Sequence, residues 1–243
     1  MAVQYNPGIV TDGLVLCLDA ANLKSYPGTG TGWRDVSLQN NITSLVNGPT
    51  YSSVNGGVLN FDGTNDYVTL PRGIFGVGNN AFAVSVWFKT TSGGVLLSNA
   101  ANNPTDINGD AVAGMYVDSN GKLVTACFYD GAGNIAGTST QSVNNGLWHN
   151  AVVTVSPAYT GAVNHFSYLN GVLFDSRVRG QSSIVSTGGY FLCGGRFFGF
   201  LYPNWPASNY LNCQIGNVSI YRKTLSSFEI QQNFNALRGR FGI

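Results

Sequence analysis

The sequence is poor in charge: its 243 residues include 12 Lys and Arg against 11 Asp and Glu, for a formal net charge of +1 at pH 7. Nucleic acids and anionic membranes are bound through concentrated basic surfaces, and no run of five basic residues occurs. We therefore expect neither nucleic acid nor a membrane as partner. Disordered chains combine low hydrophobicity with high net charge, whereas this chain is 44% hydrophobic and 12% aromatic. It is predicted to fold.

The sequence shows no pattern typical of a signal peptide or a membrane-spanning helix, so neither is expected. The first basic residue is Lys24, so residues 1–20 have no positively charged start of the kind that opens a signal peptide. No stretch of 18 apolar residues occurs, which is about the length that a membrane-spanning helix needs. We expect a protein that is made and assembled in the cytoplasm of a host cell.

Cysteines are few and widely spaced. None of the four forms a Cys-x-x-Cys motif, so neither a zinc site nor a dithiol redox motif is indicated. Unpaired cysteine behaves as a small hydrophobic residue, and a chain of this length has enough core without bridges. We expect buried free thiols. Cys193 and Cys213 are the pair to test first for a bridge, and the sequence leaves their pairing open.

Turn signals are abundant. Asn-Gly and Asp-Gly pairs such as Asn170-Gly171 recur along the chain, and they mark tight turns because these residues tolerate positive φ. Many short strands with turn signals between them predict an all-β sandwich of antiparallel strands. Apolar side chains alternate within residues 82–88, which predicts one face in the core. The β-branched or aromatic runs cover residues 14–18, 58–61, 67–70, 82–88, 123–129, 151–155, 165–169, 190–193 and 214–221.

One helix is predicted near the C-terminus. Ser226 at the N-cap and Glu229 three residues later form a capping box. Ile230 and Phe234 lie on one apolar stripe that follows it. Gly239 is the candidate C-cap, so the helix is expected over residues 227–238.

No linker or internal repeat divides the chain, so a single domain over residues 1–243 is expected. Within the first 50 residues, the segment Ala20–Thr50 is rich in Gly and Asn. We expect it to be a long loop that wraps the sandwich.

Acid–base chemistry has few candidate residues. Glu229 is the only glutamate, and its capping role accounts for it. A glycosidase needs two carboxylates that flank the scissile bond, so a pair here would be Asp62 with Asp66. The alternative that we favour is that these carboxylates hydrogen-bond the backbone of a tight turn. His149 and His165 are expected at strand edges or on the surface, and no Gly-x-Ser-x-Gly elbow is present.

A short acidic segment resembles the start of a calcium loop. Asp106, Asn108 and Asp110 space three oxygen-bearing side chains two residues apart. An EF-hand loop requires Gly at its sixth position and Glu at its twelfth, where this chain has Ala111 and Val117. An EF-hand is therefore excluded. A Ca²⁺ site of another kind stays an alternative, and no other cofactor is expected.

The most unusual segment is residues 196–210, which holds six aromatic residues and two prolines without alternation and is therefore predicted as a loop. Aromatic side chains anchor protein interfaces and also suit sugar rings. Three alternatives stay open: contact with a protein partner, contact with a glycan, and burial at the edge of the sandwich. Trp33 is a second candidate contact residue. The candidates in the segment itself are Phe197, Phe198, Phe200, Tyr202 and Trp205.

Several segments, taken in order, resemble the laminin-G-like branch of the concanavalin A-like lectin/glucanase superfamily. The resemblance covers nearly the whole chain and implies a jelly-roll sandwich of two antiparallel sheets. The glucanase branch carries a Glu-x-Asp-x-Glu strand, which a chain with one glutamate cannot supply. The matching segments are residues 13–22 (GLVLCLDAAN), 61–68 (FDGTNDYV), 82–88 (FAVSVWF), 146–149 (GLWH), 168–171 (YLNG), 215–221 (IGNVSIY) and 225–230 (LSSFEI).

Three further segments, residues 25–33, 47–51 and 235–242, look like those of stand-alone versions of the laminin-G-like domain. Such stand-alone domains are common among bacteriophage structural proteins. The resemblance implies a non-catalytic protein of the virion surface, a capsid decoration (cement) or fibre-associated protein that contacts other virion subunits. The alternative is a lectin-like module or adhesin that binds a cell-surface glycan, and an Asp-based glycoside hydrolase ranks third. A homo-oligomer would suit a virion component, although no residue demands one.

Overall fold

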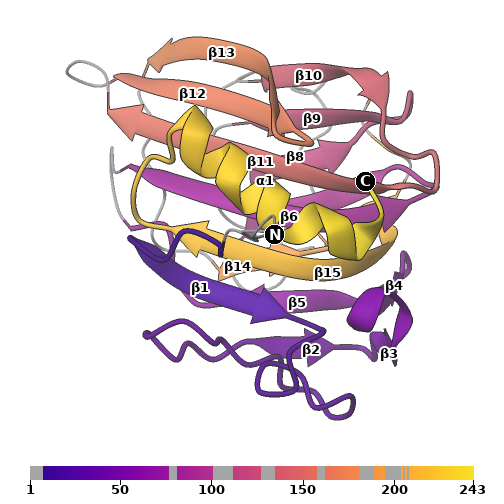
Figure 1. Cartoon of the computed structure of the whole chain (residues 1–243). Helices are drawn as coiled ribbons and strands as arrows, with labels where there is room; N and C mark the ends of the chain where they lie inside the picture. The colour runs from indigo at the N-terminus through magenta and orange to yellow at the C-terminus, as the bar shows by residue number, and fades with distance from the viewer. Residues whose placement is uncertain are drawn as a thin grey trace, which may run out of the picture.

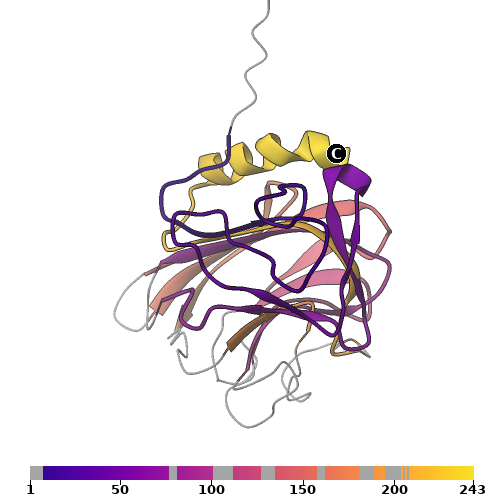
Figure 2. The ribbon, with the colours of Figure 1, turned by 90° about the horizontal axis from the view of Figure 1, so that it is seen from below.

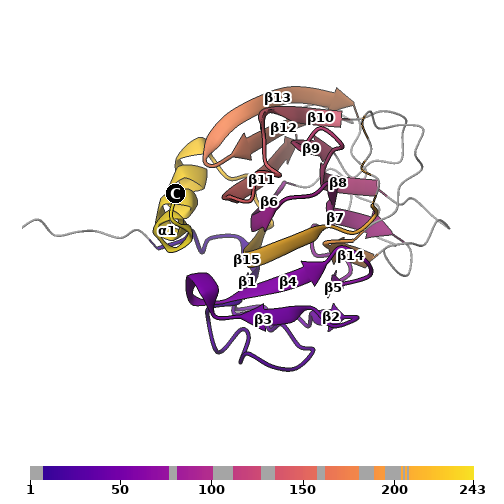
Figure 3. The same cartoon turned by 90° about the vertical axis from the view of Figure 1, so that its right-hand side faces the viewer.

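The computed structural model describes residues 8–76, 81–100, 112–126, 135–157, 162–180, 189–194, 204, 206 and 208–243. Two antiparallel β-sheets lie face to face in this part (Figures 1 and 3). The eight-stranded sheet, sheet 1, contains β1 (Leu14–Asp19), β3 (Thr50–Ser52), β4 (Val58–Asp62), β6 (Phe82–Thr90), β11 (Trp148–Pro157), β12 (Ala162–Leu169), β13 (Val172–Gly180) and β15 (Asn212–Tyr221). The seven-stranded sheet, sheet 2, contains β2 (Ser44–Val46), β5 (Tyr67–Leu70), β7 (Gly94–Ala100), β8 (Val112–Val117), β9 (Lys122–Ala126), β10 (Ile135–Ser142) and β14 (Gly189–Leu192). A short 3-10 helix, η1 (Val54–Gly56), and one α-helix, α1 (Ser227–Phe241), complete the described elements. The predicted all-β sandwich with one C-terminal helix is confirmed.

The strand order brings distant parts of the chain together. Sheet 1 runs β13-β12-β11-β6-β15-β4-β3, and β1 pairs with β15 as well. Sheet 2 runs β10-β9-β8-β7-β14-β5-β2. In sheet 1 the last strand, β15, therefore lies between β6 and β4, and in sheet 2 the late strand β14 lies between β7 and β5. The predicted turn at Asn170-Gly171 joins β12 to β13, and both residues have positive φ, 52° and 76°.

The main core lies between the two sheets. In β6, Val84, Val86 and Phe88 point into it, as the alternation predicts. The opposite face of β6 is buried as well, since Ala83 and Trp87 belong to clusters that include residues of α1. The helix covers the outer face of sheet 1 (Figure 2). The sequence pattern of one strand does not reveal this second buried face because the covering helix comes from the other end of the chain.

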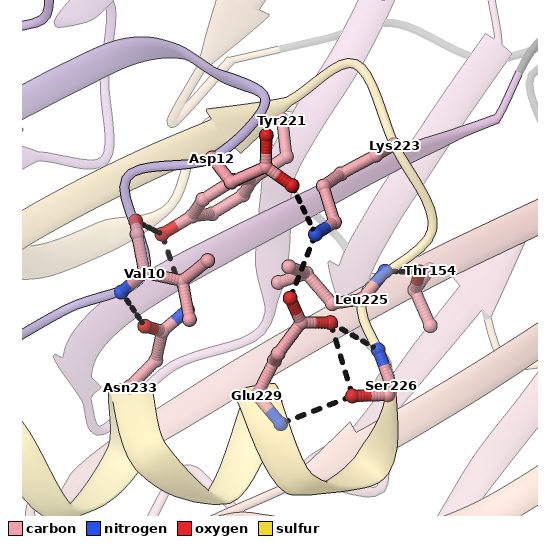
Figure 4. A network of polar contacts seen from close by, with 9 residues as sticks. All are labelled: Val10, Asp12, Thr154, Tyr221, Lys223, Leu225, Ser226, Glu229 and Asn233. Atoms are coloured by element: carbon pink, nitrogen blue, oxygen red, sulfur yellow. Dashed lines mark hydrogen bonds and ion pairs between the residues drawn. The ribbon is translucent and has the colours of Figure 1, made fainter.

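The predicted capping box is present at the start of α1 (Figure 4). The Ser226 N–H donates to Glu229 Oε2 at 2.9 Å, and the Glu229 N–H donates to Ser226 Oγ at 3.3 Å. Lys223 Nζ forms ion pairs of 2.7 Å with Asp12 Oδ2 and Glu229 Oε1. The hydrogen bond from Lys223 is the main cause that lowers the pKa of Glu229. These contacts hold the N-terminal segment and the helix start together.

The helix ends later than predicted. It continues through Gly239 to Phe241, and Gly242 caps it with a φ of 75°. The Phe241 ring centroid lies 4.5 Å from those of Trp87 and Trp148, and this burial stabilises the last turn. Glycine inside a helix costs only about 1 kcal/mol relative to alanine, so the packing of Phe241 outweighs the C-cap signal. No helix in the described ranges combines the length and hydrophobicity of a membrane span.

Residues 20–43 connect β1 of sheet 1 to β2 of sheet 2 and are called the N-terminal loop from here on (Figure 1). The Val36 N–H donates to the carbonyl of Cys17 in β1 at 2.9 Å. The Leu45 N–H of β2 donates to the carbonyl of Thr31 at 2.7 Å. The loop is thus hydrogen-bonded to a strand of each sheet.

Candidate binding surface

Most of the predicted contact residues fall outside the described part of the chain. These are Phe197, Phe198, Phe200, Tyr202 and Trp205, and the same holds for the predicted calcium ligands Asp106, Asn108 and Asp110. Trp33 is described, and its side chain is 0% exposed within the core between the sheets. A buried indole presents no face to a partner, so the prediction of Trp33 as a contact residue is wrong. Within the described ranges, no cluster of three His, Cys, Asp or Glu side chains is placed to hold a metal ion.

The carboxylates of Asp62 and Asp66 accept hydrogen bonds from backbone N–H groups of the turn in which they lie. Asp62 Oδ1 accepts the N–H groups of Thr64 at 2.7 Å and Asn65 at 3.3 Å, and the bond from Thr64 contributes most to lowering the pKa of Asp62. Asp66 Oδ2 accepts the Asp62 N–H at 3.1 Å, and burial raises the pKa of Asp66. Opposed pKa shifts would suit a glycosidase pair, but neither side chain lines the cavities described below. The geometry matches the structural alternative.

Both histidines are buried, which corrects their predicted place at strand edges or on the surface. His149 Nε2 lies 3.0 Å from Asn145 Oδ1, and burial lowers its pKa. His165 is fully buried, with Nδ1 at 3.4 Å from Ser167 Oγ. The sequence places His165 in a strand but does not show that its side chain points between the sheets. Neither imidazole is open to a substrate.

A cavity of about 630 Å³ opens in the N-terminal loop. Along its wall the chain alternates: Trp33, Asp35 and Ser37 are buried, whereas Arg34 and Val36 are exposed. At residues 35–38 this strand-like alternation turns the polar side chains of Asp35 and Ser37 inward and the apolar side chains of Val36 and Leu38 outward, the reverse of the usual arrangement.

The carboxylate of Asp35 explains why polar groups turn inward. Asp35 Oδ1 accepts the N–H groups of Cys17 and Ser37, both at 2.8 Å. Asp35 Oδ2 accepts the Ser37 hydroxyl at 2.8 Å and the Asn41 N–H at 3.0 Å. Buried polar groups are costly unless they are hydrogen-bonded, and here both oxygens are. Asp35 therefore fixes the loop against β1 and holds the outward side chains on a defined backbone.

Apolar side chains stand on the outside of this loop. Leu38 is 95% exposed, Ile42 86% and Leu23 74%, and Val36 is exposed as well. These are four of the ten large apolar side chains that the described residues expose. Single exposed apolar residues are ordinary, but a concentration of them marks an interaction site.

Two cations accompany these apolar residues. Lys24 and Arg34 line the cavity, and neither forms an ion pair with another described residue. The one acid of the cavity wall, Asp35, is turned inward. Lys24, Arg34, Val36 and Ile42 thus line one cavity, and the exposed Leu23 and Leu38 directly precede or follow residues of its wall in the sequence. This part of the surface is called the loop surface and is defined by Leu23, Lys24, Arg34, Val36, Leu38 and Ile42.

A smaller cavity of about 210 Å³ lies where β4, β6 and β15 meet in sheet 1. The Gln214 side-chain amide donates to Asn60 Oδ1 at 2.8 Å, and Asn60 Nδ2 donates to the Thr50 carbonyl at 3.0 Å. Amides and hydroxyls of this kind can hydrogen-bond sugar hydroxyls. This polar groove is lined mainly by Asn60, Lys89, Thr90, Thr91, Asn212 and Gln214.

A family model described as the concanavalin A-like lectin/glucanases superfamily, of the third laminin G type, matches residues 62–231. The chain belongs to this superfamily. The resemblance carried by the sequence segments is thereby confirmed. No curated protein matches the sequence.

Several solved structures are similar in fold over nearly the whole of this chain. Trypanosoma rangeli sialidase in complex with sialic acid has a TM-score of 0.64 at 16% identity, over 98% of this chain and 36% of that one. The binding domain of Paraclostridial Mosquitocidal Protein 1 has a TM-score of 0.62 at 14% identity, over 92% and 52%. The binding domain of botulinum neurotoxin serotype D has a TM-score of 0.56 at 13% identity, over 93% and 52%. Such identities show the fold alone, and this chain matches only a third to a half of each neighbour.

Proposed function

We propose that this chain is a non-catalytic binding domain of a virion surface, which attaches to a protein partner through the loop surface. The observation that carries the proposal is the exposure of Leu38, Ile42 and Leu23 on a loop whose backbone Asp35 holds in place. The virion as its setting rests on the resemblance of the terminal segments to bacteriophage structural proteins. A capsid decoration or fibre-associated protein binds its partner without catalysing a reaction. A non-catalytic role agrees with the carboxylates of Asp62 and Asp66, which accept backbone hydrogen bonds within their turn.

The loop surface fits a partner segment that combines apolar and acidic side chains. Burying an exposed leucine or isoleucine stabilises a complex by about 1.5 to 3 kcal/mol before the costs of association. A carboxylate on the partner would pair with Lys24 or Arg34, which line the cavity without an acid of their own. Charge complementarity of this kind mainly raises the association rate and the specificity.

The proposal is tested by replacing Leu38 and Ile42 together with serine. Mass spectrometry of purified virus particles from the source culture first tests whether the chain is a stoichiometric component. The same particles then serve as the probe in the binding experiment. We expect the variant to co-sediment with particles at least about tenfold more weakly than the wild type. Its melting temperature should not change, because both side chains are exposed.

A variant with Val54→Ser and Leu147→Ser is the matched control, since these side chains are also exposed but lie elsewhere. It should co-sediment like the wild type. Equal binding by the loop variant would show that the loop surface is the wrong site. Absence of the chain from the particles would contradict the virion setting.

The polar groove supports a second candidate function, the binding of a cell-surface glycan. Its amide and hydroxyl groups are the observation that favours it, and two structural neighbours are named binding domains of toxins. On a panel of immobilised polysaccharides, saturable binding should weaken at least about tenfold in Gln214→Ala if two hydrogen bonds are lost. The control Gln141→Ala removes an exposed amide outside the groove. Binding that is absent for the wild type, or equal in both variants, would count against this function.

A further inference from the structure

Two buried thiols meet between the sheets. Cys193 directly follows β14 of sheet 2, and Cys213 lies in β15 of sheet 1. Their Sγ atoms are 3.2 Å apart, and both residues are buried in the main core. The buried free thiols predicted from the sequence are confirmed for Cys17, Cys193 and Cys213, and only the last two touch each other.

The backbone around the pair is held firmly. The Cys193 N–H donates to the Leu96 carbonyl at 2.9 Å, and the Leu211 N–H donates to the Cys193 carbonyl at 3.1 Å. Cys213 pairs in register with Phe61 of β4 and Thr90 of β6. A disulfide bond is about 2.05 Å long, so a shift of roughly 1 Å between the two sulfur atoms separates the observed contact from a bond. Neither strand has to leave its sheet.

We propose that Cys193 and Cys213 form a disulfide that crosslinks the two sheets when the chain folds in the presence of a low-molecular-weight disulfide such as oxidised glutathione. The thiolate of one cysteine attacks a sulfur of glutathione disulfide and releases one glutathione thiolate. The second cysteine then attacks the protein sulfur of the mixed disulfide and releases the second glutathione. Two cysteine thiols are oxidised, one glutathione disulfide is reduced to two thiols, and the two protons end on those thiols.

Burial explains why the reaction belongs to folding rather than to the folded state. Desolvation raises the pKa of Cys193 well above its ordinary value, and only the thiolate is a nucleophile. The finished core also excludes glutathione from both sulfurs. During folding the thiols are still accessible, and the native strand positions bring them together.

Cys17 provides an internal control. Burial raises the pKa of its thiol to about 11, so it resembles Cys193 in reactivity. Its strand neighbours Leu16 and Leu18 point into the core between the sheets, and Cys17 therefore lies on the opposite face of β1. No other described thiol contacts it. Burial and thiol chemistry are thus similar, and the partner sulfur is the difference.

The crosslink would close a loop of chain that contains the predicted contact residues Phe197–Trp205. A disulfide stabilises mainly by restricting the unfolded chain, although strain in the folded state reduces the gain. For a separation of 20 residues we expect the oxidised protein to melt roughly 5 to 10 °C above the reduced protein. The inference does not depend on the loop surface or on the polar groove.

The test refolds the wild-type chain with oxidised glutathione, and in parallel with a reducing agent, and then labels free thiols with N-ethylmaleimide in denaturant. Intact mass should show two labels after oxidative folding and four after reductive folding, because the chain has four cysteines. Peptide mapping should join the peptides of Cys193 and Cys213. In Cys17→Ser the link should persist, with one label left, whereas Cys213→Ser should carry three labels.

The wild-type measurement needs no variant to fold, so the proposal stays testable if Cys213→Ser aggregates. Four labels after oxidative folding would overturn it. A bridge that joins any other pair of cysteines would overturn it as well.

Discussion

Replacing Phe234 with alanine is expected to lower the free energy of unfolding by about 3 to 5 kcal/mol, the usual range for a buried phenylalanine. The Phe234 ring is buried on the outer face of sheet 1 and stacks on Trp87, with centroids 5.6 Å apart and planes 5° apart. Its removal leaves a cavity beneath α1 and exposes Trp87 to water. Urea unfolding followed by tryptophan fluorescence measures both the loss of stability and the change around Trp87.

Phe228 supplies the matched control in the same helix. Its side chain is 78% exposed, so Phe228→Ala should change the free energy of unfolding by no more than about 0.5 kcal/mol. Equal effects of the two substitutions would mean that α1 does not pack on sheet 1 through Phe234. The loop surface should keep its binding in both variants, since it lies outside the helix interface.

Replacing Gly57 with alanine is expected to cost about 3 kcal/mol or more, because the substitution combines backbone strain with a clash. Gly57 has a φ of 147°, a conformation that side chains rarely permit. An added Cβ would lie 2.3 Å from the Ala20 carbonyl oxygen and 2.8 Å from the Ala21 Cα. Both neighbours are backbone atoms at the start of the N-terminal loop, so they cannot move aside as a side chain would. Thermal and urea unfolding measure the loss.

Gly239→Ala is the control of the same chemistry. Gly239 lies inside α1, and nothing lies within 4 Å of an added Cβ. Alanine is the better helix former, so this substitution should stabilise the protein by about 0.5 to 1 kcal/mol. A Gly57→Ala protein as stable as the wild type would show that the chain between η1 and β4 does not approach the loop backbone this closely.

The fold was largely predictable because its signals are local. Alternation in β6, the Asn170-Gly171 turn and the capping box at Ser226 each depend on residues close in sequence, and the structure contains all three. What failed depends on contacts between distant residues. Gly239 is a good local stop signal, but the packing of Phe241 on Trp87 carries the helix past it.

The candidate site was less predictable for the same reason. Trp33 has the aromatic side chain that is typical of a contact residue, and only the assembled core shows that this side chain is buried. The loop surface was missed because alternation normally places apolar side chains inside the protein. Here the buried hydrogen bonds of Asp35 keep the polar side chains of this segment inside instead. The available signal was the alternation of the polar residues Asp35 and Ser37 with the apolar residues Val36 and Leu38. The turn role of Asp62 was foreseen because its hydrogen bonds reach only a few residues along the chain.

The covering of sheet 1 by α1 has a practical consequence for attaching labels. Gln232 of the helix donates to the Gly8 carbonyl at 2.8 Å, and the helix itself ends two residues before Ile243. Both ends of the described chain therefore lie beside the helix (Figure 1). A fluorophore or affinity tag fused at either end would project from that face. Molecules immobilised by such a tag would turn sheet 2, which lies on the far side of the sandwich from α1 (Figure 3), toward the analyte.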